Sequence, residues 1–435
     1  MDETSTFIRC AALLLWATSL AGCSGGGSTP SGTTHASSAS PTPAATASPQ
    51  GETGGAATAF AASVGVDVHM STQTYAQNPA AVAALVAQLG VRHLRDSTFP
   101  GQQNMCALFQ NYAANGVRFD FIVTPGETDA QLQSWQSCSA PAAEAYEGYN
   151  EYDLSNDPNW PQTLRTAQQQ IYAYAHGIGL PAVGPALISG GDYGEVGPVP
   201  ADYGNFHDYF AGRNPGNPGF GGTFPPFGTY GSLAYDMNIA RQTTGQAPLW
   251  STETGYGDAP GSIDPVPPVT KMHYSLRTLF LHWNAGVPRT YFYELLDENN
   301  GDFGSFGLAT PQLQPKPAFY AISNLLAHLA GSQTTTAALP YSLTAPSTVD
   351  HTLLTRSPTQ FTLALWEEVP EWNPVTNQLI AVTPQAVTLN FATRPQAVSV
   401  TTFNTQGQTS TATQTPAASL TLRVDGSPSL VDITI

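Results

Sequence analysis

Residues 143–153, AEAYEGYNEYD, decide how the sequence is interpreted, because an apolar run ends there in the polar pair Asn150-Glu151. The run has the length and composition of a buried strand. Further along the chain, residues 248–257, PLWSTETGYG, repeat the pattern, with Glu253 at the end of another predicted strand. A single glutamate of this kind is usually a solvated loop residue. Two glutamates at matching strand ends, three strand–helix units apart, indicate a shared site instead.

Strand and helix patterns alternate from residue 59 to residue 331, which predicts an α/β domain of the (β/α)8 TIM barrel type. A doubly wound open sheet is the alternative, but no glycine-rich phosphate loop follows the first predicted strand. The predicted strands are residues 62–70, 91–96, 118–124, 143–150, 182–189, 205–209, 248–252 and 289–295. The predicted helices are residues 79–89, 104–115, 129–137, 161–177, 233–243, 271–284 and 316–330.

The helical period disappears after residue 331, and apolar and polar residues alternate to the end of the chain. This pattern predicts a small antiparallel β-sandwich over residues 332–435, with a packing or carbohydrate-accessory role. Its predicted strands are residues 361–366, 386–391, 397–403, 420–424 and 430–435.

The composition limits the classes of partner that we expect for the protein. The chain has 435 residues and a formal net charge of −17, with only 10% charged residues. This acidic balance argues against nucleic acid or an anionic membrane surface as the main partner. Low charge with many Gly, Pro, Ser and Thr residues is typical of an exported protein, and we expect a monomer.

The first residues predict a lipoprotein-type signal peptide over residues 1–23. An apolar run ends in Leu20-Ala21-Gly22-Cys23, which resembles a bacterial lipobox, so Cys23 would be lipidated. Cleavage of an ordinary leader at another site is the alternative. Residues 24–58 are rich in Ser, Thr, Pro and Gly and predict a disordered linker. We therefore expect a bacterial cell-envelope lipoprotein or a secreted protein, with membrane contact only through the lipid anchor.

Two cysteines, Cys106 and Cys138, remain after the leader. An even pair in an exported chain predicts one disulfide, and two buried free thiols are the alternative.

The residues at the predicted carboxyl ends of the barrel strands are polar, and sites in such barrels lie at that end. No His-x-x-x-His or similar spacing is present, so we expect no metal and no cofactor. The candidate site residues are His69, Arg95, Asn150, Glu151, His207, Tyr209, Glu253, Tyr293 and Glu294.

These residues resemble the active site of a clan A glycoside hydrolase, nearest in appearance to the β-xylosidase and α-L-iduronidase family and its relatives. Asn150-Glu151 matches the acid/base motif, and Glu253 in WSTETGY matches the nucleophile. Residues 306–326, FGLATPQLQPKPAFYAISNLL, resemble the last strand-to-helix region of that clan. Tyr152 is a departure, because many members carry proline there.

The resemblance implies a retaining glycosidase that cleaves O-glycosidic bonds of an extracellular oligo- or polysaccharide. Glu151 would protonate the leaving oxygen and Glu253 would attack the anomeric carbon. Arg95 would keep Glu253 ionised, while Asn150 and His207 would bind the sugar. A catalytically inactive barrel that binds extracellular glycan is the alternative, and a metal-dependent hydrolase that uses His69 and His207 is a further one.

Overall fold

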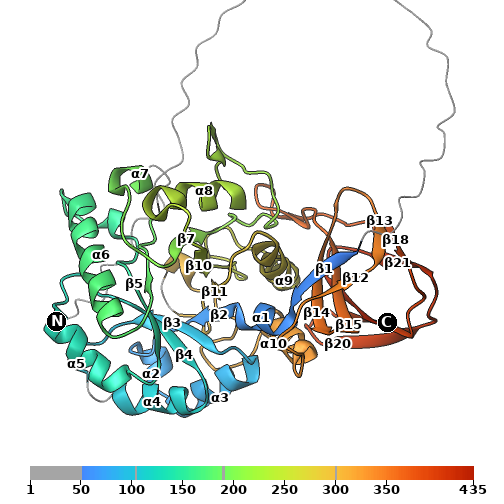
Figure 1. Ribbon diagram of the computed structural model, residues 1–435. Coiled ribbons are helices and arrows are strands. Elements are labelled where there is room, and N and C mark those ends of the chain that lie inside the picture. The colour runs from blue at the N-terminus through green and yellow to red at the C-terminus, as the bar shows by residue number, and fades with distance from the viewer. Residues whose placement is uncertain (1–50, 103–104, 189–191, 299–300) are drawn as a thin grey trace, which may run out of the picture. The chain divides into compact units, whose positions relative to one another are not determined.

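The computed structural model describes residues 51–102, 105–188, 192–298 and 301–435. Eight parallel strands follow the order β6-β5-β4-β3-β2-β11-β10-β7 (Figure 1). The two end strands meet through backbone hydrogen bonds, from Gly184 N to Tyr203 O at 2.8 Å and from Asp202 N to Ala182 O at 2.9 Å. The sheet is therefore a nearly closed barrel, and the predicted fold class is confirmed.

The barrel strands are β2 (Val64–Asp67), β3 (His93–Ser97), β4 (Arg118–Ile122), β5 (Ala143–Glu147), β6 (Ala182–Val183), β7 (Gly204–Asp208), β10 (Leu249–Thr254) and β11 (Thr290–Phe292). The helices are α1 (Ala57–Ala62), α2 (Gln73–Ala76), α3 (Pro79–Leu89), α4 (Cys106–Ala114), α5 (Asp129–Ser139), α6 (Trp160–Gly177), α7 (Asp192–Val196), α8 (Leu233–Thr244), α9 (Pro268–Asn284) and α10 (Pro317–Leu329). Two 3-10 turns, Tyr152–Leu154 and Gly301–Phe303, and a small hairpin, β8 (Thr223–Phe224) with β9 (Gly228–Thr229), lie in the loops.

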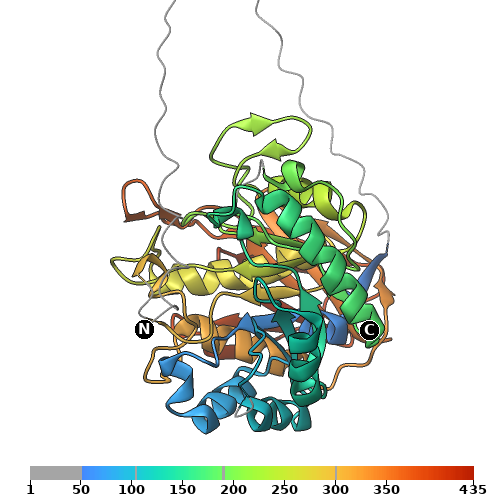
Figure 2. The ribbon, with the colours of Figure 1, turned by 90° about the vertical axis from the view of Figure 1, so that its left-hand side faces the viewer.

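The helices surround the strands, and their ends follow from local sequence signals. In Figure 2, α6 (green) and α5 (teal) cover the side of the barrel nearest the viewer. The α3 helix begins after Asn78, whose side chain accepts a hydrogen bond from Ala81 N, and ends at Gly90 with φ 89°. Thr128 and Gln131 form a capping box on α5. These caps satisfy backbone groups that the helix itself leaves unpaired.

Several predicted strands are shorter than the sequence pattern suggested, and the first and fifth differ clearly. The first was expected over residues 62–70, but α1 extends to Ala62 and β2 begins at Val64. The fifth was expected over residues 182–189, and β6 ends at Val183. Gly184 and Pro185 follow, and proline has no N–H to donate to a neighbouring strand, which explains the early end.

β10 contains an irregularity that aims Glu253. Ser251 is paired with Phe206 and Glu253 with His207, so Thr252 is an extra residue relative to β7. Such a bulge changes the direction of the following side chains and is common next to active sites. Glu253 was expected just past a strand ending at residue 252. It lies inside β10 instead, because this strand continues to Thr254, and it is only 8% exposed.

The carboxyl-terminal region consists of antiparallel strands, as predicted. One sheet has the order β12-β1-β14-β15-β22-β19-β20, and the other has the order β13-β18-β21. Their apolar faces enclose a core that includes Leu353, Leu363, Val387 and Val431. The strands are β12 (Ala337–Leu339), β13 (Tyr341–Thr344), β14 (Val349–Ser357), β15 (Gln360–Glu367), β18 (Gln385–Phe391), β19 (Ala397–Phe403), β20 (Thr409–Gln414), β21 (Ser419–Val424) and β22 (Ser429–Thr434), with a hairpin of β16 (Trp372–Asn373) and β17 (Gln378–Leu379).

Residues 52–58 correct the predicted linker. β1 (Glu52–Ala56) pairs antiparallel with β12 and parallel with β14, so the prediction of disorder up to residue 58 is wrong for this segment. Its glycines serve close packing, because a Cβ atom on Gly55 would lie 2.6 Å from Cζ2 of Trp283. Residues 24–50 of the predicted linker, and the predicted signal peptide with Cys23, lie outside the described residues.

The sandwich packs directly against the barrel helices α1, α9 and α10 (Figure 1). Trp366 of β15 is fully buried and stacks on Phe280 of α9, with ring centroids 5.4 Å apart. The Arg277 side chain of α9 is also fully buried and donates to the carbonyls of Val369 and Gly426. Apolar packing and the hydrogen bonds of the Arg277 guanidinium thus join the sandwich to the barrel.

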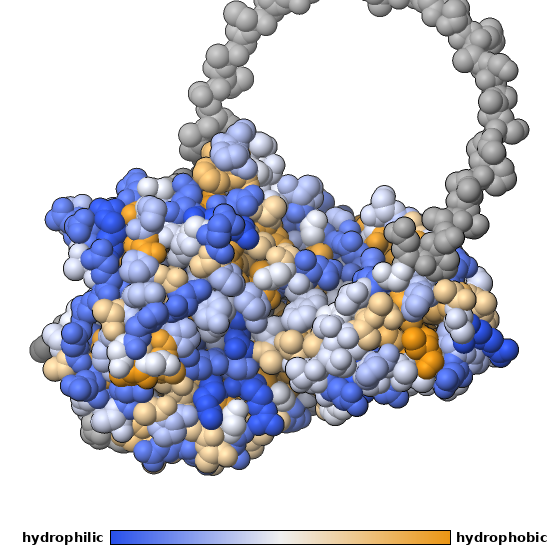
Figure 3. Space-filling model, in the orientation of Figure 1, coloured by the Kyte–Doolittle hydropathy of each residue, from blue (hydrophilic) through white to orange (hydrophobic). Residues whose placement is uncertain are grey.

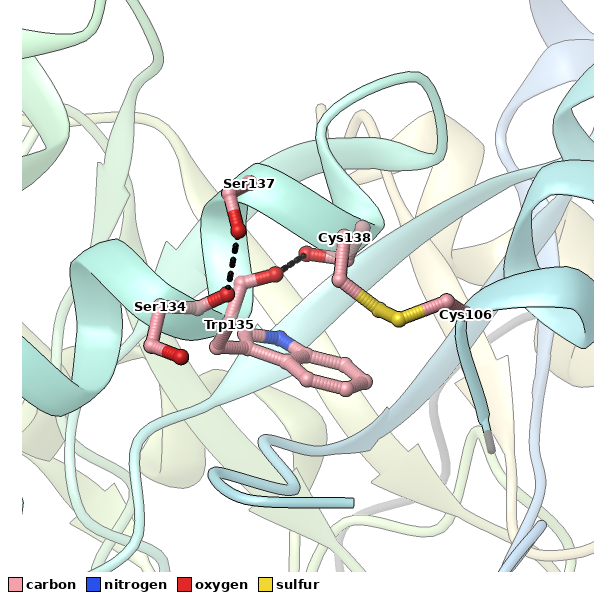
Figure 4. Close-up of a disulfide and its surroundings, with 6 residues drawn as sticks. Cys106, Ser134, Trp135, Ser137 and Cys138 are labelled. Carbon is pink, nitrogen blue, oxygen red and sulfur yellow. Dashed lines mark hydrogen bonds between the residues drawn. A yellow bond between two sulfur atoms is a disulfide. The ribbon is translucent and has the colours of Figure 1, made fainter. Parts of the chain in front are cut away.

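The predicted pairing of Cys106 with Cys138 is present. The disulfide joins α4 to α5, and the two Cα atoms are 5.0 Å apart. Figure 4 shows the bond above the ring of Trp135, which is itself buried. Neighbouring helices of the barrel are therefore linked covalently on the outside of the strands.

The described surface is mainly polar. The face in Figure 3 is largely hydrophilic, and its strongly apolar areas are small and separate. Among the described residues, no helix combines the length and the apolar character that crossing a membrane requires. The exposed large apolar side chains of the described chain are Ile178, Phe224, Tyr230, Val375, Leu379 and Ile380.

Candidate active site

Glu253 is held by two donors from other strands. Nη1 of Arg95, on β3, lies 2.8 Å from Oε1 of Glu253. The Tyr209 hydroxyl, just after β7, donates to Oε2 at 2.7 Å. Each carboxylate oxygen therefore has one strong donor, and the two bonds fix the plane of the carboxylate.

The electrostatic surroundings keep Glu253 ionised. Burial raises the pKa of its carboxyl, but the charges of His207 and Arg95 and the two hydrogen bonds outweigh that effect. The net result is a pKa below the ordinary value of 4.5. Glu253 is therefore a carboxylate at neutral pH, as a nucleophile must be.

Arg95 is itself fixed by a residue that the sequence interpretation did not select. Glu147, at the end of β5, accepts from Nε at 2.8 Å and from Nη2 at 2.7 Å. Asn150 also accepts from Nη2, at 2.7 Å. No sequence signal separates Glu147 from Glu144 of the same strand. In the structure, the neighbouring Tyr146 packs outward against Tyr174 of α6, and Glu147 faces the interior because strand side chains alternate. The fork geometry of arginine and carboxylate is what orients Arg95 toward Glu253.

Glu151 is bonded to His207, and the hydrogen-bond pattern assigns the imidazole protons. Asn205 Nδ2 donates to Gly184 O, so its Oδ1 accepts from the Thr252 hydroxyl at 2.7 Å. The Thr252 oxygen must then accept from Nε2 of His207, 3.1 Å away. The 2.8 Å contact between Nδ1 of His207 and Oε1 of Glu151 therefore contains a single proton, which the two atoms share as a hydrogen bond.

The histidine also links the two glutamates. Its Nδ1 lies 3.7 Å from Oε2 of Glu253. Burial lowers the pKa of His207, but the charges of Glu253 and Glu151 more than compensate and the pKa is raised. One carboxylate oxygen of Glu151 and one of Glu253 lie within 4.8 Å of each other. The two glutamates therefore face each other at the carboxyl ends of β5 and β10.

Three further polar residues form a second group, which we call the His69 cluster (His69, Glu294 and Glu298). Nδ1 of His69 lies 2.5 Å from Oε2 of Glu298 and 3.1 Å from Oε2 of Glu294. Thr72 donates to the other oxygen of Glu298. The sequence interpretation included His69 and Glu294 but missed Glu298, which follows in the loop after β11.

Tyr293 lies between the His69 cluster and the glutamate pair. Its ring centroid is 5.7 Å from that of His69 and 6.1 Å from that of Phe306. Phe306 is in turn 5.9 Å from the ring of Tyr209. The negative charges of Glu294 and Glu253 both raise the pKa of Tyr293, in addition to burial, so both carboxylates lie close to it. The two groups of polar residues are thus parts of one site.

Buried acids lie beneath the site inside the barrel. Asp67 of β2 is 2% exposed, and its Oδ1 is 3.7 Å from Nη1 of Arg95. Burial raises the pKa of Asp67 well above its usual range, and Arg95 opposes this only in part. Burial, followed by the charge of Glu147, likewise raises the pKa of Asp120 on β4. Both carboxyls therefore favour the protonated form.

Two sets of side chains within the described residues could hold a metal ion by geometry. They are the His69 cluster and the trio Glu151, His207 and Glu253, whose ligand atoms lie within 4.8 Å of one another in each set. Each set is also a network of histidine–carboxylate contacts, which explains the geometry without an ion.

Comparisons with solved structures identify proteins with the same fold. A family 39 glycoside hydrolase from Bacteroides cellulosilyticus WH2 aligns with a TM-score of 0.59 at 13% identity, over 86% of this chain and 82% of that one. A family 51 α-L-arabinofuranosidase from Thermotoga petrophila RKU-1 aligns with a TM-score of 0.51 at 11% identity, over 82% and 89%. Another arabinofuranosidase aligns with a TM-score of 0.52 at 9% identity, over 88% and 100%.

Neither the family models nor the curated proteins that were searched include a match to this sequence. The fold is that of clan A glycoside hydrolases, so the resemblance inferred from the sequence is confirmed at the level of the fold. Fold alone does not assign a reaction, which has to be argued from the site.

Proposed function

We propose that the protein is a retaining glycosidase that acts on an extracellular oligo- or polysaccharide. The observation that supports this most directly is the pairing of Glu151 and Glu253 across one site, with carboxylate oxygens within 4.8 Å. Retaining enzymes hold their carboxyl groups about 5–5.5 Å apart, whereas inverting enzymes leave about 6.5–9.5 Å for a water. The short spacing favours direct attack by Glu253.

The first step transfers the sugar to Glu253. One of its carboxylate oxygens attacks the anomeric carbon while the bond to the leaving oxygen breaks. Glu151 gives its proton to that oxygen, so the leaving group departs as a neutral alcohol. Arg95 and Tyr209 hold the attacking carboxylate in position. Because the pKa of Glu253 lies below its ordinary value, this carboxyl is already ionised before the attack.

The second step returns Glu253 to its starting state. Water attacks the anomeric carbon of the glycosyl ester, its proton passes to Glu151, and the carboxylate of Glu253 is released. His207 supports both steps, because its contact with Glu151 lets the imidazole pair with the carboxylate once the proton has left. Asn150, which is held by Arg95, is placed to contact a sugar hydroxyl next to Glu253.

The location is part of the proposal. Residues 20–23 have the lipobox pattern, and the folded chain carries a disulfide, a bond that persists in oxidising compartments. We infer an exported protein that is tethered to the cell envelope through Cys23.

The deciding experiment follows the anomeric configuration of the first product by proton NMR, after a screen of aryl glycosides and polysaccharides. A retained anomer is expected, together with a loss of turnover in Glu253→Gln of at least about 1,000-fold. Glu144→Gln is the matched control, because Glu144 is a β5 glutamate that pairs with His93 rather than with the site. An inverted anomer would refute the mechanism. Full activity in Glu253→Gln would refute the assignment of the nucleophile, and glycan binding without turnover in the wild type would favour an inactive binder.

A further inference from the structure

The first observation concerns the positive charges of the chain. The sequence has 14 Lys and Arg residues, and all but Arg9 lie in the described part of the chain. Among these described cations, Arg95 alone contacts the glutamate pair. Arg95 is only 3% exposed, and Glu147, Asn150 and Glu253 accept four of its N–H groups. The remaining Nη1 hydrogen has Asp67 at 3.7 Å, so no donor of Arg95 is left for a substrate carboxylate.

The two lysines are also fully engaged. Lys271 Nζ donates to the carbonyls of Ser305, Phe306 and Gly307 and lies 3.4 Å from Asp258. Lys316 Nζ lies 2.7 Å from both Asp258 and Asp297. The other described arginines lie on outer helices, at the amino-terminal ends of strands or in the sandwich, except Arg213. Arg213 follows β7 at the same end of the barrel as the site, and its guanidinium donates to Ala211 O and lies 4.1 Å from the centroid of the Phe220 ring. Among the described lysines and arginines, Arg95 alone has an ion-pair contact with the glutamate pair, and none has one with the His69 cluster.

The second observation is an excess of negative charge in the His69 cluster. Within the described parts of the chain, His69 is the sole basic partner of both Glu294 and Glu298. Its Nδ1 has one hydrogen, which the closer Glu298 accepts at 2.5 Å. Glu294 is fully buried. Its Oε2 has only the 3.1 Å ion-pair contact with Nδ1 of His69, whose hydrogen Glu298 accepts, and its Oε1 has no hydrogen-bond partner among the described residues. A buried carboxylate with so few donors is costly in a protein interior, and the donors of a bound ligand relieve that cost.

We propose that the sugar unit bound beside Glu253 carries no carboxylate, and that Glu294 accepts hydrogen bonds from its hydroxyl or amino hydrogens. This inference rests on the proposed function and names its substrate class: neutral or amino sugars, with uronic acids excluded. A uronate in the same position would meet Glu294 and Glu298, which have no lysine or arginine partner among the described residues. Repulsion between like charges and the lack of an ion-pair partner both disfavour the binding of a uronate.

Matched pairs of aryl glycosides test the proposal, for example a glucoside with its glucuronide and a galactoside with its galacturonide. The two members differ only in the carboxylate. We expect kcat/KM for the neutral member to exceed that for the uronide by at least about 100-fold, because the uronide leaves a charge unpaired. Equal values, or a preference for the uronide, would overturn the proposal.

A variant tests whether Glu294 causes the discrimination. Glu294→Gln keeps the size of the side chain and removes its charge. It should lower kcat/KM for the neutral sugar and narrow the ratio of neutral sugar to uronide by about 10-fold. Glu195→Gln removes a charge from an exposed position of α7 and should leave the ratio unchanged. An unchanged ratio in Glu294→Gln would show that Glu294 does not select the substrate.

A binding measurement separates failure of this inference from failure of the proposed function. The Glu253→Gln variant is titrated by calorimetry with glucose, xylose, glucosamine and glucuronate. Binding of a neutral or amino sugar with no binding of glucuronate supports the inference, even if no glycoside is hydrolysed. Tighter binding of glucuronate, or binding of none of these sugars, would contradict it.

Discussion

Arg95 and Glu253 are 158 positions apart in the sequence, yet Nη1 of one lies 2.8 Å from Oε1 of the other. Their strands, β3 and β10, are not neighbours in the sheet, because β2 and β11 lie between them. The contact therefore spans the interior of the barrel, where Arg95 is buried and oriented by Glu147. Closure of the barrel is what makes this ion pair possible. Together with the charge of His207, the ion pair lowers the pKa of Glu253 against the effect of burial.

Replacement of Arg95 should change the pH dependence of the reaction. Arg95→Lys keeps the charge but loses the fork of donors, so the support of Glu253 weakens and the pKa of its carboxyl rises. Because Glu253 must be ionised to attack in the proposed mechanism, the acidic limb of the kcat/KM profile should move to higher pH. The maximum value of kcat/KM should fall about 10-fold to 100-fold. Arg92→Lys, whose Nη1 donates to a surface carbonyl, is the control. A profile with an unmoved acidic limb would contradict the role given to Arg95.

Replacement of Glu151 should affect substrates according to their leaving groups. Glu151→Ala removes the proton donor, so glycosides of poorly acidic alcohols should slow by about 100-fold to 10,000-fold. Dinitrophenyl glycosides need little protonation and should slow far less in the glycosylation step. A plot of log kcat/KM against leaving-group pKa should therefore be steeper than for the wild type. The same slope in both proteins would rule out Glu151 as the acid.

Glu294 should make stability depend on pH. Burial raises the pKa of its carboxyl to about 7, from an ordinary value of 4.5. The folded state thus holds this proton more strongly than the unfolded state. The resulting stabilisation is complete below pH 4.5 and is lost as the pH rises through 7.

The Glu294→Gln variant has no proton to lose at this position. It should match the wild type near pH 4.5 and exceed it by up to about 3 kcal/mol at pH 8. Denaturant unfolding at the two pH values measures the difference. A difference that does not change between pH 4.5 and pH 8 would show that Glu294 has an ordinary pKa.

Loss of the disulfide should lower stability without affecting the site. The bond between Cys106 and Cys138 closes a loop with a sequence separation of 32 residues. Loop-closure entropy predicts that the double Ser variant loses about 3–4 kcal/mol. Its kcat/KM should stay within about twofold of the wild type, because α4 and α5 lie outside the barrel strands. Two free thiols in native wild-type protein would contradict the pairing.

The membrane tether can be tested through Cys23. In Cys23→Ser cells, the protein should leave the membrane fraction or accumulate unprocessed, because the lipobox interpretation predicts that the lipid attaches to that sulfur. Radiolabelled fatty acid should label the wild type and not the variant. Membrane fractionation that is unaffected by the substitution would favour an ordinary leader.

The local pattern of the sequence was enough to place most elements of the barrel. Pro79–Leu89 could be assigned because proline begins the helix, apolar side chains recur at helical spacing, and Gly90 ends it. Strands such as Arg118–Ile122 are short apolar runs between such helices. The polar ends of these strands could then be collected into one site, because parallel strands of a barrel end on the same side.

Local sequence patterns do not predict contacts between segments that are far apart in the chain. The glycines of β1 are typical of a flexible linker. The segment is a strand only because it pairs with β12 and β14, which lie far along the chain. Thr355, which donates to Gly54 O, is 301 positions away. Glu147 has no feature of its own that distinguishes it from Glu144 in the same strand. The register of β5 in the closed barrel decides that Glu147, and not Glu144, contacts Arg95.

The sequence by itself therefore determined the fold class and the identity of the two facing glutamates, since both depend on short-range periodicity and on the ends of strands. The tertiary structure alone decided how the site is charged. The bulge at Thr252 turns Glu253 toward His207, and burial leaves Glu294 with His69 as its one charged partner among the described residues. Both effects arise from the packing of segments far apart in the chain, and the charge of a buried group depends on all the neighbours that packing brings to it.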